Sequence, residues 1–215
     1  MSQETDLLDS NFVKPATYKE FAFPLTFTFK IGTLANDFVA KDASGKTIAY
    51  VRQKMFKLKE AIMIYSDESK SNLLYKINAD RIIDFNASYN FTTADEQVVG
   101  RVGRRGMRSL WKANYEIFNT DNKSEYSIKE ENPWSKVFDA MLGEVPLLGM
   151  FSGYMFNPKY GVFDNDGKIV ARLSKQPSFF GRNFKLEKLE DLKEGDDERV
   201  MLALMMMILL ERRRG

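Results

Sequence analysis

The C-terminal segment RVMLALMMMILLERRRG constrains the fold of this chain more than any other stretch. Between Val200 and Leu210 it carries no charged and no hydroxyl side chain. As an α-helix this run rises about 16 Å, whereas the hydrocarbon core of a bilayer is about 30 Å thick. The run is therefore too short for a membrane anchor. A helix that is apolar on all sides has to be enclosed by the rest of the protein.

The charges around this run predict that it is a helix. Acidic residues occupy Asp196–Glu198 and arginines occupy Arg212–Arg214, which is the order that the helix dipole favours. Met and Leu favour helix over strand. The unbranched side chains of Met205–Met207 can fill an irregular interior. We expect a buried central helix at about residues 196–213.

Alternating apolar and polar residues predict that most of the chain before this helix is β-structure. The stretches TFTF, WKANYEIF and EYSIK alternate in this way, as strands with one buried face do. Two turns, in FVAKDASGKTIAYVR and YGVFDNDGKIVARLS, share the pattern D-x-x-G-K-x-x-A around Gly45 and Gly167. Asp and Gly suit hairpin turns. Three further stretches, IMIYSDESKSNLLYKI, NFTTADEQVVGRV and EIFNTDNKSEYSI, read as strand, polar turn, strand.

These hairpins predict about ten to twelve short strands. So many strands leave long open edges unless the sheet closes on itself, and a closed sheet also encloses the helix. The expected fold is mainly β: a closed antiparallel barrel of about twelve strands around a central C-terminal helix. It forms a single domain over residues 21–215, after a flexible N-terminal arm at residues 1–20. The pattern predicts one further helix at Pro133–Gly143. The uncharged stretch Val145–Phe156 after it is either buried or presented to a partner.

Composition excludes several kinds of chemistry. The chain has no cysteine and no histidine, which removes disulfides, thiolate or histidine metal sites, and Cys or His catalysis. No cofactor or metal is expected. A net charge of +2 is too small to indicate nucleic-acid binding. The start, MSQETDLLDSNF, lacks the apolar region of a secretory signal, so we expect a cytoplasmic protein that associates at most peripherally with a membrane.

Familiar catalytic motifs are missing from the sequence. It has no P-loop, GRVGRRG does not match the dinucleotide fingerprint, and GMFSG misplaces the serine of a nucleophile elbow. Adjacent carboxylates such as Glu130–Glu131 are common on solvated surfaces. An acid and base from distant strands would escape this search. The expectation is that the protein is not an enzyme.

The stretch GRVGRRGMRSLWK is the candidate binding feature. Between Val98 and Tyr115 it carries five cations and no acid; the cations are Arg101, Arg104, Arg105, Arg108 and Lys112. Arginine forks suit phosphate, so one interpretation is a site for an anionic headgroup. The other is that outward arginines keep the strands soluble. A second, weaker basic stretch, VRQKMFKLK, has the same two interpretations; its cations are Arg52, Lys54, Lys57 and Lys59.

Longer stretches of the chain resemble the LURP-one-related family, which is grouped with the tubby C-terminal domains and the phospholipid scramblases. The resemblance lies in VRQKMFKLKEAIMIYSDESKSNLLYKINADRIIDF, GMRSLWKANYEIF, ENPWSKVFDAMLGEVPLLGMFSGYMFNPKY, LSKQPSFFGRNFKLEKL and the C-terminal helix, from about Val39 onward. It implies a twelve-stranded barrel threaded by its last helix. The tubby domains bind phosphatidylinositol bisphosphate through basic residues, so the resemblance also implies an anionic membrane lipid as ligand.

Besides an unrecognised enzyme, three functions remain open at this point. The first, which we expect, is a non-enzymatic module that recognises anionic phosphoinositide headgroups at a membrane surface. The second is a protein-interaction or structural scaffold, with Val145–Phe156 as its contact surface. The third is a scramblase-like membrane protein that inserts its C-terminal segment, which the short apolar run of Val200–Leu210 disfavours.

Overall fold

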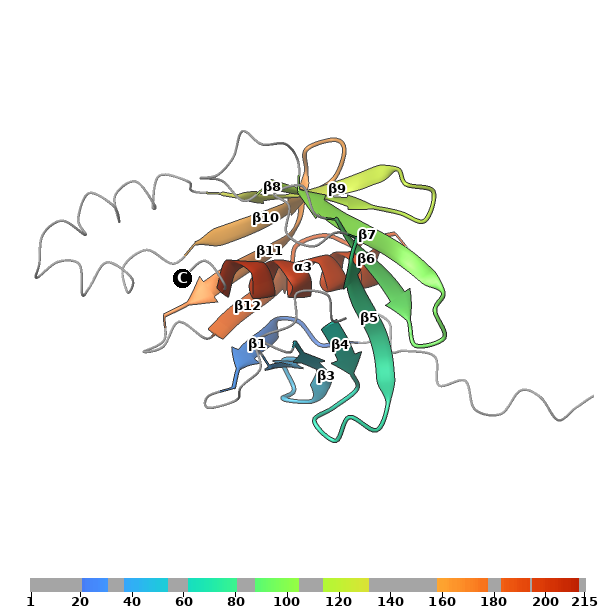
Figure 1. Ribbon diagram of the computed structural model, residues 1–215. Coiled ribbons are helices and arrows are strands. Elements are labelled where there is room, and N and C mark those ends of the chain that lie inside the picture. The colour runs from blue at the N-terminus through green and yellow to red at the C-terminus, as the bar shows by residue number, and fades with distance from the viewer. Residues whose placement is uncertain are drawn as a thin grey trace, which may run out of the picture.

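The computed structural model describes residues 21–30, 37–53, 62–80, 88–104, 114–131, 158–177, 183–193 and 195–212. In these ranges the chain forms twelve strands and one helix, labelled as in Figure 1. The strands are β1 (Leu25–Phe29), β2 (Phe38–Lys41), β3 (Thr47–Arg52), β4 (Ile62–Tyr65), β5 (Leu73–Ala79), β6 (Ser88–Thr93), β7 (Val98–Arg104), β8 (Asn114–Phe118), β9 (Ser124–Glu130), β10 (Lys159–Phe163), β11 (Ile169–Gln176) and β12 (Asn183–Lys188). The helix is α3 (Asp196–Arg212).

The strands close into one antiparallel barrel. Each strand pairs with the next along the chain, and the first and last, β1 and β12, pair with each other, for example Phe27 opposite Phe184. Side chains alternate between the two faces of the sheet, so that Phe27 and Phe29 are buried while Thr28 between them is exposed. Closure leaves the sheet without an edge strand. The prediction of a mainly β, closed barrel of about twelve strands is confirmed.

The two turns that share a sequence pattern also share a structure. In each, the aspartate Oδ1, of Asp42 or Asp164, accepts the backbone N–H groups two and four residues further on, at 2.8–3.0 Å. The glycines adopt left-handed backbones, with φ of 85° at Gly45 and 80° at Gly167. Asp thus ties the turn, and Gly adopts a positive φ without the clash that a Cβ would cause.

Helix α3 lies inside the barrel, across its interior in Figure 1. Every side chain from Val200 to Leu209 is at most 6% exposed, so the apolar run is enclosed on all sides, as the sequence predicts. The helix spans Asp196–Arg212, within the expected range of about residues 196–213. Within the described ranges, no helix is both long and apolar enough to cross a membrane.

The barrel has two distinct ends. We call one the turn end, because the hairpin turns after β2, β4, β6, β8 and β10 lie there. Helix α3 starts at this end, since its Asp196 contacts Tyr126 near the start of β9. The helix finishes at Arg212 at the opposite end, which we call the C-terminal end. In Figure 1 the turns after β6 and β8 lie on the right, and the letter C marks the other side.

Several expectations fall on residues outside the described ranges. These are the N-terminal arm at residues 1–20, the helix at Pro133–Gly143 and the uncharged stretch Val145–Phe156. They stay predictions.

Candidate functional site

Arg101, the first cation of the predicted binding stretch, lies on the outer face of the barrel. Its guanidinium stacks on the ring of Phe118 in the neighbouring strand β8, with 3.7 Å between Cζ and the ring centroid. Its Nε donates to Asn122 Oδ1 at 2.6 Å, and its Nη1 donates to Ser88 Oγ at 3.1 Å. Arg101 therefore joins three neighbouring elements of the wall, and much of its donor capacity is already used.

Of the other cations of this stretch, only Arg104 lies within the described ranges, as the last residue of a strand. Arg104 ends β7, opposite Tyr115 of β8, whose ring is buried. The remaining three residues, Arg105, Arg108 and Lys112, lie outside the described ranges.

The weaker basic stretch begins at Arg52, the last residue of β3. Arg52 is half-buried, and its Nε is buried without a hydrogen-bond partner. The three lysines of this stretch, Lys54, Lys57 and Lys59, lie outside the described ranges.

The strands that lead into the two basic stretches, β3 and β7, end at the same end of the barrel. Arg52 ends β3 and Arg104 ends β7, and both strands run from the turn end to the C-terminal end. Helix α3 also finishes there, at Arg212. Two strands that are far apart in the sequence, each followed by basic residues, therefore end on one side of the barrel.

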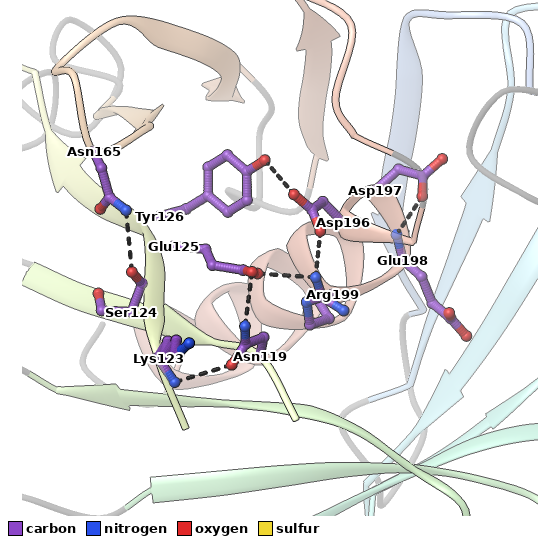
Figure 2. A network of polar contacts seen from close by, with 10 residues as sticks. All are labelled: Asn119, Lys123, Ser124, Glu125, Tyr126, Asn165, Asp196, Asp197, Glu198 and Arg199. Atoms are coloured by element: carbon purple, nitrogen blue, oxygen red, sulfur yellow. Dashed lines mark hydrogen bonds and ion pairs between the residues drawn. The ribbon is translucent and has the colours of Figure 1, made fainter. Parts of the chain in front are cut away.

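A second polar group lies at the turn end, where α3 meets the barrel wall (Figure 2). Tyr126 of β9 donates its hydroxyl hydrogen to Asp196 Oδ2 at 2.6 Å. Arg199 donates from Nη2 to Glu125 Oε2 at 2.8 Å and also to Asp196 Oδ1. Asn119 Nδ2 donates to Glu125 Oε1 at 2.9 Å. Both carboxylates are thus bound through both of their oxygens.

Two tyrosines in this region are kept in the neutral form. Burial raises the pKa of Tyr126, and the bond to Asp196 raises it further. Burial also raises the pKa of Tyr75, with a smaller contribution from the nearby carboxylate of Glu198. Both phenols therefore remain donors well above neutral pH.

The network at the turn end anchors the helix to the barrel wall. Its acids are committed to internal bonds, and no cluster of three or more potential metal ligands occurs among the described residues. The sequence shows only part of it, since the acids of Asp196–Glu198 are predicted as helix-dipole partners. Nothing local in the sequence indicates Tyr126, which is 70 residues away from Asp196.

A third polar group surrounds Tyr50, on the outer face of β3. The Tyr50 hydroxyl donates to Asp37 Oδ2 at 2.5 Å. The ring lies near two ammonium groups, with centroid distances of 5.5 Å to Lys30 Nζ and 5.4 Å to Lys70 Nζ. Burial raises the pKa of Tyr50, and the hydrogen bond to Asp37 raises it further. Arg52 lies two residues after Tyr50 in β3, on the same face of the strand.

Comparison with known proteins identifies the family of this chain. The family described as LURP-one-related matches residues 47–209, which is most of the chain. The matched span begins with β3 and continues into α3. No curated protein matches the chain. Because the match covers well over half of the sequence, and includes both the barrel strands from β3 onward and the central helix, this chain belongs to the LURP-one-related family.

Proposed function

We propose that this protein is a non-enzymatic binding module that recognises anionic phosphoinositide headgroups at a membrane surface. The observation that carries the proposal is the direction of β3 and β7, the two strands that hold the first residues of the basic stretches Arg52–Lys59 and Arg101–Lys112. Both strands end at the C-terminal end of the barrel. Cations that follow strand ends on one side of a barrel can attract an anionic surface together.

The family membership supports the same function. The barrel with its enclosed helix has the architecture that the resemblance to tubby domains implies, and those domains bind phosphatidylinositol bisphosphate through basic residues. The arginines of this chain are not matched one by one to tubby positions. The support therefore concerns the class of ligand rather than individual contacts.

The burial of α3 favours a peripheral module over a scramblase-like protein that inserts its last segment. Insertion would need the side chains of Val200–Leu209, which are at most 6% exposed inside the barrel. Releasing them would expose the barrel core to water, at a cost of about 1.5–3 kcal/mol for each large apolar side chain.

Co-sedimentation with liposomes tests the proposal. The purified protein is mixed with neutral vesicles or with vesicles that contain phosphoinositide, at low and at high salt. We expect binding only to the anionic vesicles and weaker binding at high salt, because salt screens exposed charges. Binding to both kinds of vesicle regardless of salt would indicate insertion. No binding to either would contradict the lipid function and favour the protein-interaction scaffold, with Val145–Phe156 as its surface.

A triple variant, Arg104→Gln with Arg105→Gln and Arg108→Gln, tests the charges themselves. Each cation near an anionic surface contributes about 1 kcal/mol, so the loss of three should weaken vesicle binding by about two orders of magnitude. Equal binding by the variant and the unmodified protein would exclude these residues.

The barrel itself supplies a control with the same change in charge at its other end. Lys46, Lys123 and Lys168 are exposed residues of hairpin turns at the turn end. Their triple substitution by Gln should leave vesicle binding within about threefold of the unmodified protein, because only the long-range part of the attraction is lost. Circular dichroism of both triple variants checks that the barrel stays folded.

A further inference from the structure

Asp37 and Arg52 lie opposite each other on the outer face of the barrel. In the pairing of β2 with β3, Phe38 is opposite Val51 and Val39 is opposite Tyr50. The same antiparallel register places Asp37, just before β2, opposite Arg52 at the end of β3. The side chains of Phe38 and Val51 are fully buried in the core, so their neighbours Asp37 and Arg52 are on the other face.

Each of these two side chains has one buried atom without a hydrogen-bond partner. Asp37 is 4% exposed, and while its Oδ2 accepts from Tyr50, its Oδ1 has no partner. On the facing strand the Nε of Arg52 is buried and also without a partner. Buried polar groups are nearly always hydrogen-bonded, and charged ones most of all. An unused acceptor and an unused donor on facing positions suit a ligand that offers both a donor and an acceptor.

The surrounding charge favours an anion. Lys30 and Lys70 each place an ammonium group over the Tyr50 ring, at 5.5 Å and 5.4 Å from its centroid. Glu68 forms an ion pair with Lys30, while no carboxylate among the described residues pairs with Lys70. With Arg52, the group contains three cations and two carboxylates, so it carries one positive charge in excess.

We propose that this face of β2 and β3 binds a phosphorylated polyol. Arg52 and Lys70 hold the phosphate, and Asp37 Oδ1 accepts a hydrogen bond from a neighbouring hydroxyl of the ligand. An inorganic phosphate satisfies the cations but offers little to the carboxylate. A polyol phosphate satisfies both. This inference rests on the proposed function, and it moves the specific contacts from β7 to β3.

The comparison with Arg101 is the reason for that move. The guanidinium of Arg101 is stacked on Phe118 and hydrogen-bonded to Asn122 and Ser88. In contrast, the Nε of Arg52 makes no hydrogen bond. A ligand that reaches Arg52 therefore has no hydrogen bond of Nε to replace, whereas at Arg101 it competes with the barrel wall.

Calorimetric titration with inositol trisphosphate and, separately, with inorganic phosphate tests the site. We expect inositol trisphosphate to bind the unmodified protein more tightly than inorganic phosphate does. Arg52→Gln should weaken its binding at least tenfold, since a charge-assisted hydrogen bond is lost. The matched control is Arg172→Gln, which removes one arginine from the outer face of β11 and should change binding less than threefold.

Asp37→Asn separates the two halves of the site. It removes the negative charge and keeps the size of the side chain. We expect it to weaken binding of inositol trisphosphate and to leave binding of inorganic phosphate equal or stronger. The preference for the polyol should therefore fall at least several-fold. An unchanged preference would overturn the role of Asp37.

Lys70→Gln provides a second variant if Arg52→Gln fails to fold, because Lys70 lies in a surface turn. Thermal unfolding of every variant accompanies the titrations. If Arg52→Gln and Lys70→Gln, both folded, bind inositol trisphosphate as the unmodified protein does, the site is wrong. A loss of stability without a loss of binding would identify Asp37 and Arg52 as a structural cross-strand pair, and would also overturn the proposal.

The same variants on vesicles distinguish the source of the phosphate and the two proposals. Binding of phosphoinositide vesicles that depends on Arg52, without binding of free inositol trisphosphate, supports the site for a lipid headgroup only. Vesicle binding that is the same in all variants refutes the site and leaves the proposed function standing. No binding of vesicles or of free inositol trisphosphate by the unmodified protein refutes both.

Discussion

The substitution Gly100→Ala should reveal how closely α3 is fitted against the barrel wall. Gly100 lies in β7, and the side chain of Arg199 packs against it. A Cβ added at this position would come within 2.5 Å of the backbone oxygen of Phe118 and within 2.6 Å of Arg199 Cδ. The backbone φ is 153°, in a region that side chains rarely adopt.

Two contributions set the size of the effect. The unfavourable backbone conformation costs about 1–3 kcal/mol. Overpacking against a backbone atom, which cannot turn away as a side chain can, adds about 1–3 kcal/mol. We therefore expect Gly100→Ala to lower the free energy of unfolding by about 2–6 kcal/mol, a large share of the stability of a domain of this size.

Urea unfolding followed by tryptophan fluorescence and circular dichroism measures this loss. The control is Gly45→Ala, which also has a positive φ, of 85°, but has no atom within 4 Å of the added Cβ. It should cost only the conformational part, about 1–2 kcal/mol. Equal losses for the two variants would refute the close packing of Gly100. Because part of the clash is with Arg199, the double variant Gly100→Ala with Arg199→Ala should lose less than the sum of the single variants.

Three further results are expected. Gly167→Ala should cost about as much as Gly45→Ala, within about 0.5 kcal/mol, in the same urea experiment, because the two turns have the same geometry; a clearly larger difference would contradict that equivalence. Leu204→Ala should lower the free energy of unfolding by about 2–5 kcal/mol, since Leu204 is fully enclosed by the barrel; a loss below about 1 kcal/mol would indicate that α3 is not packed inside. Because the folded state raises the pKa of Tyr126 above the unfolded value of about 10, its neutral form stabilises the fold below pH 10 and this stabilisation is lost as the pH rises further. Stability measured from pH 8 to pH 11 should therefore fall above pH 10, and fall less steeply in Tyr126→Phe; identical pH profiles would count against the buried phenol.

Most of the architecture could be predicted from local patterns. An apolar run that is too short for a bilayer requires enclosure, and alternation with Asp and Gly turns predicts the hairpins that supply it. The expected helix at about 196–213 is observed at Asp196–Arg212. The turns at Asp42 and Asp164 have the same hydrogen bonds to the aspartate, as their shared sequence pattern indicates. These predictions work because the alternation of buried and exposed side chains, and the residues that a turn requires, depend on neighbouring positions in the chain.

The candidate site could be predicted only in part. The sequence indicates where cations are dense, but it treats Arg101 and Arg52 alike. In the barrel Arg101 stacks on Phe118, while Arg52 lies opposite Asp37 with its Nε unused. Which arginine is available to a ligand depends on the strand that lies beside it, and no local pattern encodes that neighbour.

The sequence by itself therefore determined the elements, the closure of the barrel and the enclosure of its last helix, since these follow from the sequence spacing of apolar, polar and turn residues. Only the tertiary structure decided the partners. Closing the sheet brings the ends of β3 and β7 to one end of the barrel, joins Tyr126 to Asp196 across 70 residues, and places Asp37 opposite Arg52. The physical reason is that hydrogen bonds and ion pairs act over a few ångströms. They depend on register and closure, which bring distant parts of the chain together.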